Sequence, residues 1–383
     1  MDKLPQVVVL MESSRGSGRA LLRGFAKYAR HHGPWAFNWE PRGLNEFRAR
    51  LGRVDAQGFF LRDGRHIQKI LALGLPTVVV GHRQENFPDA AHVVTDSEAA
   101  GRLAAGHLQA CGFKHFAFFG PRRIRWSAAR RESFQNCLKT AGHRIHSFDA
   151  PAEENAAPPR INYTATGRWL RSLPKPVGIM ACNDDSAHHL VEACKMAGLN
   201  VPDEVGIIGV DNDELVCELS SPAISSVAIN FEAAGYESAR LLDGWMRSGR
   251  ISLPARINAP ATHVVPRMST DILAVKDPRL LKALRFIRDH VRENVGVAEV
   301  ARAAGLSRRG LENRFRRDLE RSVLQEIRRS RVDLIARMLL ETDLPVAAIA
   351  SALGYENLQH IARYFRQEKN TSLIGFRKRY GRP

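Results

Sequence analysis

The sequence predicts an α/β part with parallel sheets over residues 1–270 and an all-α part over residues 278–383. Short apolar runs alternate with segments of helical spacing in the first part, which is typical of α/β layers. Beyond residue 270 the pattern is helical without strand alternation. The charge changes at the same place, because residues 276–383 hold 24 Lys and Arg against 13 Asp and Glu, or +11 of the total +17. These three observations indicate two domains of different architecture and different partners.

Six apolar runs predict the strands of the first part. They are residues 6–11, 58–61, 77–80, 116–119, 178–182 and 205–210. Several are apolar at consecutive positions, as expected of strands buried on both faces of a parallel sheet. Leu21, Phe25 and Tyr28 have the spacing of one face of a helix that follows the first run.

Polar loops follow these strands, at the edge where ligands of parallel sheets bind. The loops are residues 12–19, 120–126, 183–185 and 211–214, and they are rich in carboxylates, amides and guanidinium groups. Trp126 lies in one of them. Planar polar groups bind paired hydroxyls and an aromatic ring stacks on the apolar face of a sugar, so the set suits a sugar site. Each residue alone is better explained as a helix cap or a solvated turn, and only the recurrence at strand ends favours a site.

The all-α part begins and repeats in a recognisable way. Asp277-Pro278 is a typical helix start. An Ala-x3-Gly pattern at Ala301 recurs at Ala350, and each copy is followed by apolar anchors in a second helix, Leu311 and Phe315 in the first copy and Ile361 and Phe365 in the second. A small residue and a glycine turn let two helices cross closely, which is the requirement of a helix-turn-helix unit. Two such units in a basic domain indicate a polyanion partner, namely double-stranded DNA.

Composition excludes several other classes. The five cysteines form no CxxC pair, so neither a disulfide framework nor a zinc ribbon is expected. No apolar stretch is long enough for a signal peptide or a membrane span, so we expect a cytoplasmic protein without a membrane partner. The sequence predicts no catalytic residue, no metal ligand and no cofactor.

Each of the two parts resembles a known protein family. The all-α part resembles the AraC-type transcription-factor domain over about 100 residues. The resemblance is carried by residues 297–301 (VAEVA), 353–355 (LGY) and 362–366 (ARYFR). The α/β part resembles the LacI-type effector domain, which has the type I periplasmic-binding-protein-like fold of two α/β lobes. This resemblance is carried by residues 94–96 (VTD), 181–184 (ACND) and 205–212 (VGIIGVDN). In LacI-type proteins the DNA-binding head precedes the effector domain, but here the first strand starts near residue 6, so we expect DNA binding at the C-terminal end. The combination is similar to the xylose operon regulatory proteins.

The resemblance implies residues and partners. It implies an effector domain at 1–270, a linker at 271–277 and an AraC-type DNA-binding domain at 278–383. The implied sugar ligands are Arg19, Trp126, Arg130, Asp184, Asp211 and Asn212. The implied DNA-binding residues are Arg308, Arg309, Asn313, Arg316, Leu358, Gln359, Arg363 and Arg366. We therefore expect a D-xylose-sensing transcription activator that forms a homodimer and contacts RNA polymerase.

Four positions depart from the family pattern. Asn313 stands where Arg or Lys is usual, Leu373 replaces a proline, and Glu320 and Asn370 replace the glycine after each recognition helix. Asn tolerates a left-handed helix end and Glu tolerates it poorly, so a local difference is expected after the first recognition helix.

Three alternatives remain open at this stage. The first is a regulator of the same architecture that senses another pentose or related sugar. The second is an enzyme, but Gly16-Ser17-Gly18 lacks the third glycine of a dinucleotide fingerprint and no phosphate-binding GKS or GKT ending is present. Asp184 and Asp211 could act as an acid/base pair only if they lie at a suitable distance. The third is a sugar-binding protein whose helical tail binds protein rather than DNA.

Overall fold

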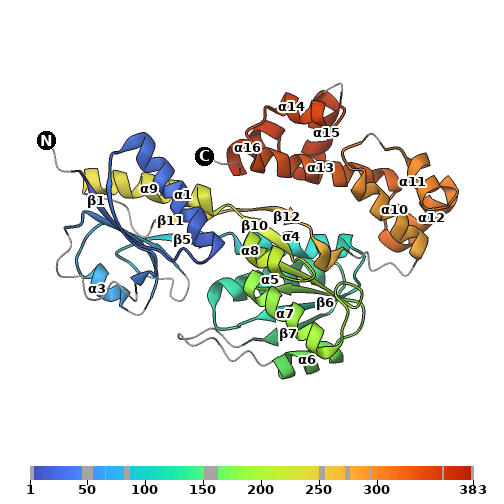
Figure 1. Ribbon diagram of the computed structural model, residues 1–383, viewed down its shortest axis with the longest axis horizontal. Helices are drawn as coiled ribbons and strands as arrows, with labels where there is room; N and C mark the ends of the chain where they lie inside the picture. The colour runs from blue at the N-terminus through green and yellow to red at the C-terminus, as the bar shows by residue number, and fades with distance from the viewer. Residues whose placement is uncertain are drawn as a thin grey trace.

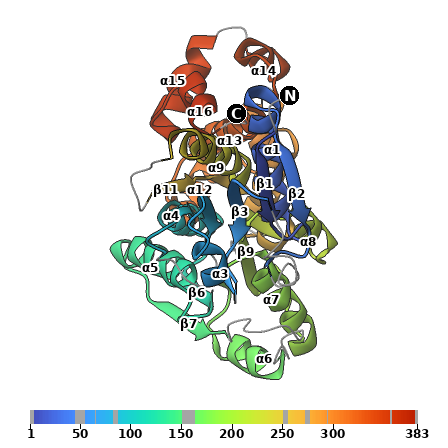
Figure 2. The same cartoon turned by 90° about the vertical axis from the view of Figure 1, so that its left-hand side faces the viewer.

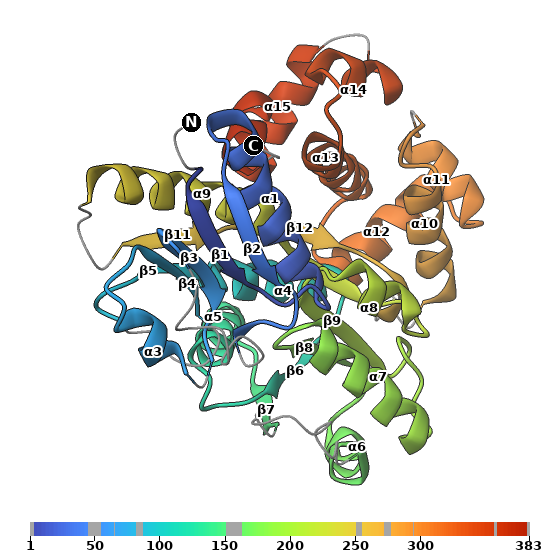
Figure 3. The same cartoon turned by 60° about the vertical axis from the view of Figure 1, so that its left-hand side comes forward.

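The protein consists of two α/β lobes and a C-terminal group of helices, seen in a computed structural model (Figure 1). The structure describes residues 4–44, 55–64, 66–81, 87–150, 163–249, 255–271, 277–293, 295–355 and 358–380. In Figures 2 and 3 the C-terminal helices gather on one side of the two lobes.

The first lobe has one parallel sheet, in the strand order β11-β5-β4-β3-β1-β2. Its strands are β1 (Gln6–Leu10), β2 (Ala36–Glu40), β3 (Gly58–Arg62), β4 (Thr77–Val80), β5 (Ala91–Thr95) and β11 (Arg256–Ala259). Its helices are α1 (Gly16–His32), α3 (Ile67–Leu71) and α9 (Phe231–Ser248). Along β1, Val7 and Val9 belong to the core under α1 and α9, whereas Val8 and Leu10 belong to the core on the α3 side. Both faces are buried, which explains the continuous apolar run.

The second lobe repeats this arrangement with the order β12-β10-β9-β8-β6-β7. Its strands are β6 (His115–Gly120), β7 (Ile145–Asp149), β8 (Val177–Ala181), β9 (Val205–Asp211), β10 (Ser225–Ile229) and β12 (Ala261–Val265), of which β12 is antiparallel to β10. Its helices are α4 (Ser97–Ala110), α5 (Arg125–Thr140), α6 (Tyr163–Ser172), α7 (Asp184–Ala197) and α8 (Glu214–Leu219). α4 and α5 pack on one face, and α6 and α7 contribute to the core on the other.

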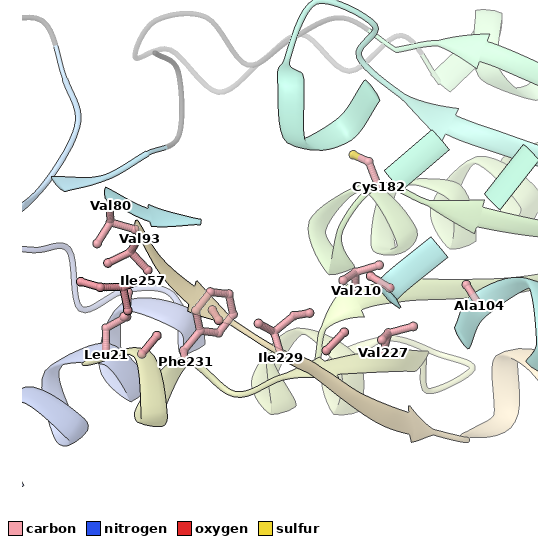
Figure 4. Close-up of a cluster of buried hydrophobic side chains, with 14 of the residues drawn as sticks. Leu21, Val80, Val93, Ala104, Cys182, Val210, Val227, Ile229, Phe231 and Ile257 are labelled. Atoms are coloured by element: carbon pink, nitrogen blue, oxygen red, sulfur yellow. The ribbon is translucent and has the colours of Figure 1, made fainter. Parts of the chain in front are cut away.

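The chain passes between the lobes three times, after β5, after β10 and between β11 and β12. Figure 4 shows the buried side chains along these passages, from Ile257 and Phe231 in the first lobe through Ile229 to Val227 and Ala104 in the second. The lobes therefore share a continuous apolar core at the passages, while their strand-end loops face each other.

The C-terminal domain has two small cores joined by one long helix. Its helices are α10 (Pro278–Asp289), α11 (Val297–Ala303), α12 (Arg308–Leu319), α13 (Val323–Glu341), α14 (Val346–Ala352), α15 (Leu358–Lys369) and α16 (Leu373–Tyr380). The first core contains Leu311 and Phe315 with the start of α13, and the second contains Ile361 and Phe365 with its end. The predicted pair of helix-turn-helix units is thus α11–α12 and α14–α15.

The local difference expected after the first recognition helix is absent from the described backbone. Glu320 has φ 56° and Asn370 has φ 54°, so both residues take the same left-handed conformation. Glu320 ends α12 by donating its backbone N–H to the carbonyl of Arg316. The expectation was wrong because the helix end imposes the conformation despite the cost for a residue with a Cβ.

No helix in the described part of the chain is both long enough and apolar enough to cross a membrane.

Candidate functional site

Arg130, Asp211 and Trp126 form a connected group at the strand ends of the second lobe. Nη2 of Arg130 donates to Oδ1 of Asp211 at 3.0 Å, and Nη1 donates to the carbonyl of Cys182 at 2.5 Å. The guanidinium carbon lies 4.9 Å from the centre of the Trp126 ring. The four-residue spacing on α5 brings the ring and the cation together.

Asp211 is the more exposed partner of this ion pair. Its side chain is 25% exposed, whereas that of Arg130 is 2% exposed. Burial raises the pKa of Asp211, and the adjacent Arg130 opposes that rise. Arg130 thus holds a partly accessible carboxylate in place and supplies its counter-charge.

Asp184 lies next to this group but is enclosed. Its Oδ2 accepts from the backbone N–H of Asp213 at 2.7 Å, and its Oδ1 accepts from the hydroxyl of Ser226 at 2.6 Å. Burial, with Asp211 nearby, raises its pKa well above the ordinary value. Asp184 thus links strand β10 with the loop that follows β9. Its direct contact with a sugar stays a prediction.

Asn212 and Arg19 are also engaged within the protein. Oδ1 of Asn212 accepts from Nη1 of Arg267 at 3.0 Å. Nη1 of Arg19 donates to the carbonyls of Ser13 and Ser14, at 2.9 and 2.8 Å. These bonds shape the two loops, and their contact with ligand likewise stays a prediction.

The two lobes are joined at these loops by polar contacts. Nη1 of Arg15 lies 2.5 Å from Oδ2 of Asp185. Asp213 accepts the backbone N–H of Gly16 at 2.6 Å, at the start of α1, and lies 3.4 Å from Nη2 of Arg19. A carboxylate at a helix N-terminus satisfies free backbone donors and complements the helix dipole. The loops of the first lobe therefore rest directly on those of the second.

Arg62 is a residue of this junction that the sequence analysis missed. It is the last residue of β3, one position beyond the predicted apolar run. Burial lowers the pKa of its guanidinium, although Glu12, Asp63 and Asp211 act in the opposite direction. The rule that ligands gather at strand ends could have found it.

The predicted DNA-binding residues share an exposed face on each recognition helix. Arg308, Arg309, Asn313 and Arg316 are exposed on α12, and Gln359, Arg363 and Arg366 are exposed on α15. The side chain of Leu358 lies outside the described residues. Tyr364 has Arg328 and Arg363 against its ring, at 4.4 and 5.2 Å from its centre. Such faces suit phosphate contacts and base-edge contacts in a major groove.

The C-terminal domain contacts the second lobe. Nη2 of Arg321 donates to the carbonyl of Ala110 at 2.6 Å, and Lys114 pairs with Glu320 at 3.2 Å. Arg288 pairs with Asp271 beside them. The β10–α9 passage is also touched, because the Asn230 amide donates to the carbonyl of Tyr380. One end of the DNA-binding domain is thus bonded to a passage between the lobes.

Two family models match the chain in agreement with this architecture. A periplasmic binding protein-like domain matches residues 105–270, and a helix-turn-helix domain matches residues 300–379. Fold and matches together define a transcription regulator, with a sugar-binding domain of the periplasmic-binding-protein-like type and a helix-turn-helix DNA-binding domain.

Full-length relatives narrow the class further. The xylose operon regulatory protein of Escherichia coli (strain K12) is 29% identical, over 97% of this chain and 96% of that protein. The protein of the same name from Haemophilus influenzae is 30% identical, over 77% of each. The solved structure of the xylose-binding transcription activator xylR has a TM-score of 0.60 at 26% identity and covers 99% of both chains. The chain belongs to the family of xylose operon regulatory proteins, and it is a regulator rather than an enzyme.

Proposed function

We propose that this protein senses D-xylose between its two lobes and activates transcription from operator DNA that its two helix-turn-helix units bind. The Arg130–Asp211 pair beside Trp126 is the observation that carries this proposal. A carboxylate held by a buried arginine accepts hydrogen bonds from sugar hydroxyls, and the indole offers an apolar face to the ring. The names of the relatives favour xylose among the pentoses.

The six predicted sugar residues divide into two groups in this proposal. Trp126 and Asp211 contact the sugar, and Arg130 orients Asp211. The remaining residues, Arg19, Asp184 and Asn212, chiefly shape the loops that surround it.

The proposed division of the chain has an effector domain at 1–270, a linker at 271–277 and a DNA-binding domain at 278–383. The last element on the effector side, Met268–Thr270, is bonded into the second sheet through Ser269, and α10 opens at Pro278 with Asp277 as its cap.

Sugar acts on DNA binding through the relative position of the lobes. Lobe closure changes DNA affinity only if sugar binds one arrangement better than the other. The protein acts as a homodimer, with the two recognition helices of each chain in successive major grooves and RNA polymerase as a further partner.

Calorimetric titration with D-xylose, D-ribose, L-arabinose and D-lyxose tests the ligand. We expect D-xylose to bind most tightly, and Asp211→Ala to weaken it about 10- to 100-fold because a charge-assisted hydrogen bond is lost. Tightest binding of another pentose would replace D-xylose as the effector.

A matched experiment tests the role of Asp211. Asp211→Ala should still fold and shift operator DNA in a gel while losing the response to D-xylose. Lower thermal stability with sugar affinity within a factor of about two would mean that Asp211 is only a structural residue.

A further inference from the structure

Arg62 is a half-buried cation at the junction of the lobes, and its hydrogen-bonding capacity is hardly used. Nη2 lies 3.5 Å from the hydroxyl of Ser17, at the limit of a hydrogen bond. Nε is buried and has no hydrogen-bond partner among the described residues. A guanidinium carries five N–H donors, and leaving buried donors unsatisfied is unfavourable.

The neighbouring arginines are satisfied differently. Arg15, Arg19 and Arg130 have carboxylates within 4 Å, namely Asp185, Asp213 and Asp211. No such ion pair of Arg62 occurs within the described parts of the chain. Packing does not need a cation here, because a partly buried charge without an ion pair does not stabilise the fold. The position is therefore better explained by a ligand than by stability.

Arg62 also lies at the start of α1, where the two lobes meet, because Nη2 of Arg62 is 3.5 Å from Ser17, and the backbone N–H of the adjacent Gly16 donates to Asp213 of the second lobe. It ends β3 in the first lobe, and its charge interacts with Asp211 of the second lobe and with Glu12 and Arg15 of the loop after β1. For a molecule between Arg62 and Asp211, the Arg62 guanidinium would offer only donors, whereas the Asp211 carboxylate would accept.

We infer that Arg62 binds the sugar from the first lobe and determines which sugars are accepted, by donating from its guanidinium to hydroxyl oxygens that act as acceptors. This inference rests on the proposed function. The hydroxyls facing Asp211 act as donors, so the two side chains impose opposite requirements on the ligand. Because Arg62 and Asp211 belong to different lobes, a sugar that satisfies both also favours the closed arrangement.

Arg62→Met and Arg62→Lys in the full-length protein test the inference, with Arg102→Gln on the exposed face of α4 as a control. By calorimetry, we expect Arg62→Met to bind D-xylose about 10- to 100-fold more weakly, and Arg62→Lys to recover part of the loss. The sugar-free Arg62→Met protein should melt at the same temperature as the wild type or higher, because a partly buried charge without an ion pair has been removed. A purely structural arginine would instead lower the melting temperature.

Monodeoxy and monofluoro D-xyloses separate the roles of the two side chains. Wild type should lose affinity for the deoxy sugar that lacks the hydroxyl facing Arg62, and Arg62→Met should no longer distinguish it from D-xylose. Fluorine accepts weakly but cannot donate, so substitution should be tolerated better opposite Arg62 than opposite Asp211.

D-Xylose affinity within twofold of wild type in Arg62→Met, or unchanged discrimination among the deoxy sugars, would overturn the inference while Asp211→Ala still tests the proposed function. Failure of wild type to bind D-xylose would overturn both.

Discussion

Two residues end the recognition helices in a conformation that favours glycine. Glu320 and Asn370 have φ values of 56° and 54°. Asn reaches this region with little strain, whereas a residue such as Glu does so at a cost of about 1–2 kcal/mol. The exposed ion pair between Glu320 and Lys114 returns little of this energy. The two positions share one backbone conformation and differ in side chain, so the strain at Glu320 can be compared directly with that at Asn370.

Glu320→Gly should therefore stabilise the C-terminal domain by about 1 kcal/mol, and Asn370→Gly by clearly less. Urea unfolding of residues 276–383 measures both and removes the contact with Lys114. Equal effects at the two positions would show that the helix ends are not strained differently.

Gln359 and Arg363 supply the second residue-scale prediction. Both are exposed on α15. A glutamine pairs with two edges of adenine and an arginine with two of guanine, each worth about 1–3 kcal/mol of discrimination. Gln359→Ala should relax the preference at one base position in a selection from randomised operators. Uniform weakening over all sequences would indicate phosphate contact instead.

At the scale of elements, sequence patterns found most of the strands that are buried on both faces. β1, β3, β4, β6, β8 and β9 were predicted within one or two residues of their ends, because continuous apolar runs follow from double burial. The edge strands β2 and β7 were missed because they expose polar residues such as Asn38 and Ser147. β10 was missed because its buried start is Ser225-Ser226, which makes hydrogen bonds rather than apolar contacts.

Contacts of the candidate site could be predicted from the sequence only where the two residues lie close together along the chain. The Trp126–Arg130 pair was predictable since four residues on one helix determine a contact. The Arg15–Asp185 pair joins residues 170 positions apart, and no local pattern encodes such a contact. Arg62 was overlooked because it lies just past an apolar run that was interpreted only as a strand.

α13 is the element that makes the DNA-binding domain one unit. Val323 and Ile327 enter the first core, and Leu334 and Leu339 enter the second. Each helix-turn-helix unit thus has its own core, and one continuous helix sets the spacing between the two.

Residues 276–383 alone should accordingly bind DNA without sugar. If Lys and Arg neutralise several phosphates, the log of the affinity should fall against log salt with a slope of about −0.9 per phosphate. Mobility-shift titrations at several salt concentrations measure the slope. A fragment that ignores DNA would contradict the assignment of α12 and α15, and would favour a protein-binding role for these helices.

For the whole molecule, the contact between the effector and DNA-binding domains encloses two histidines. His107 on α4 bonds Thr270 at 2.8 Å, and burial together with Arg329 and Arg288 lowers its pKa to about 3. His263 on β12 is buried, and its pKa is lowered to about 4 by burial, Lys369 and Arg337. Asp333 opposes both shifts without offsetting them. All four cations belong to the C-terminal domain, so docking of that domain keeps both rings neutral.

Acid should therefore loosen this contact. Each histidine has a pKa below its ordinary 6.5 when the domains are docked, so the undocked or unfolded chain binds more protons between pH 6.5 and about 4. The stabilisation is complete above pH 6.5 and decreases as the pH falls, by up to about 1.4 kcal/mol per histidine for each pH unit.

Asp184 and Asp211 have raised pKa values and act in the opposite direction, so the variants His107→Gln and His263→Gln must be compared with wild type. Thermal melts and small-angle scattering from pH 7.5 to 5 should show a falling melting temperature and an expanding wild-type protein, and a smaller change in both variants. Parallel pH curves for wild type and variants would mean that the histidines do not control docking.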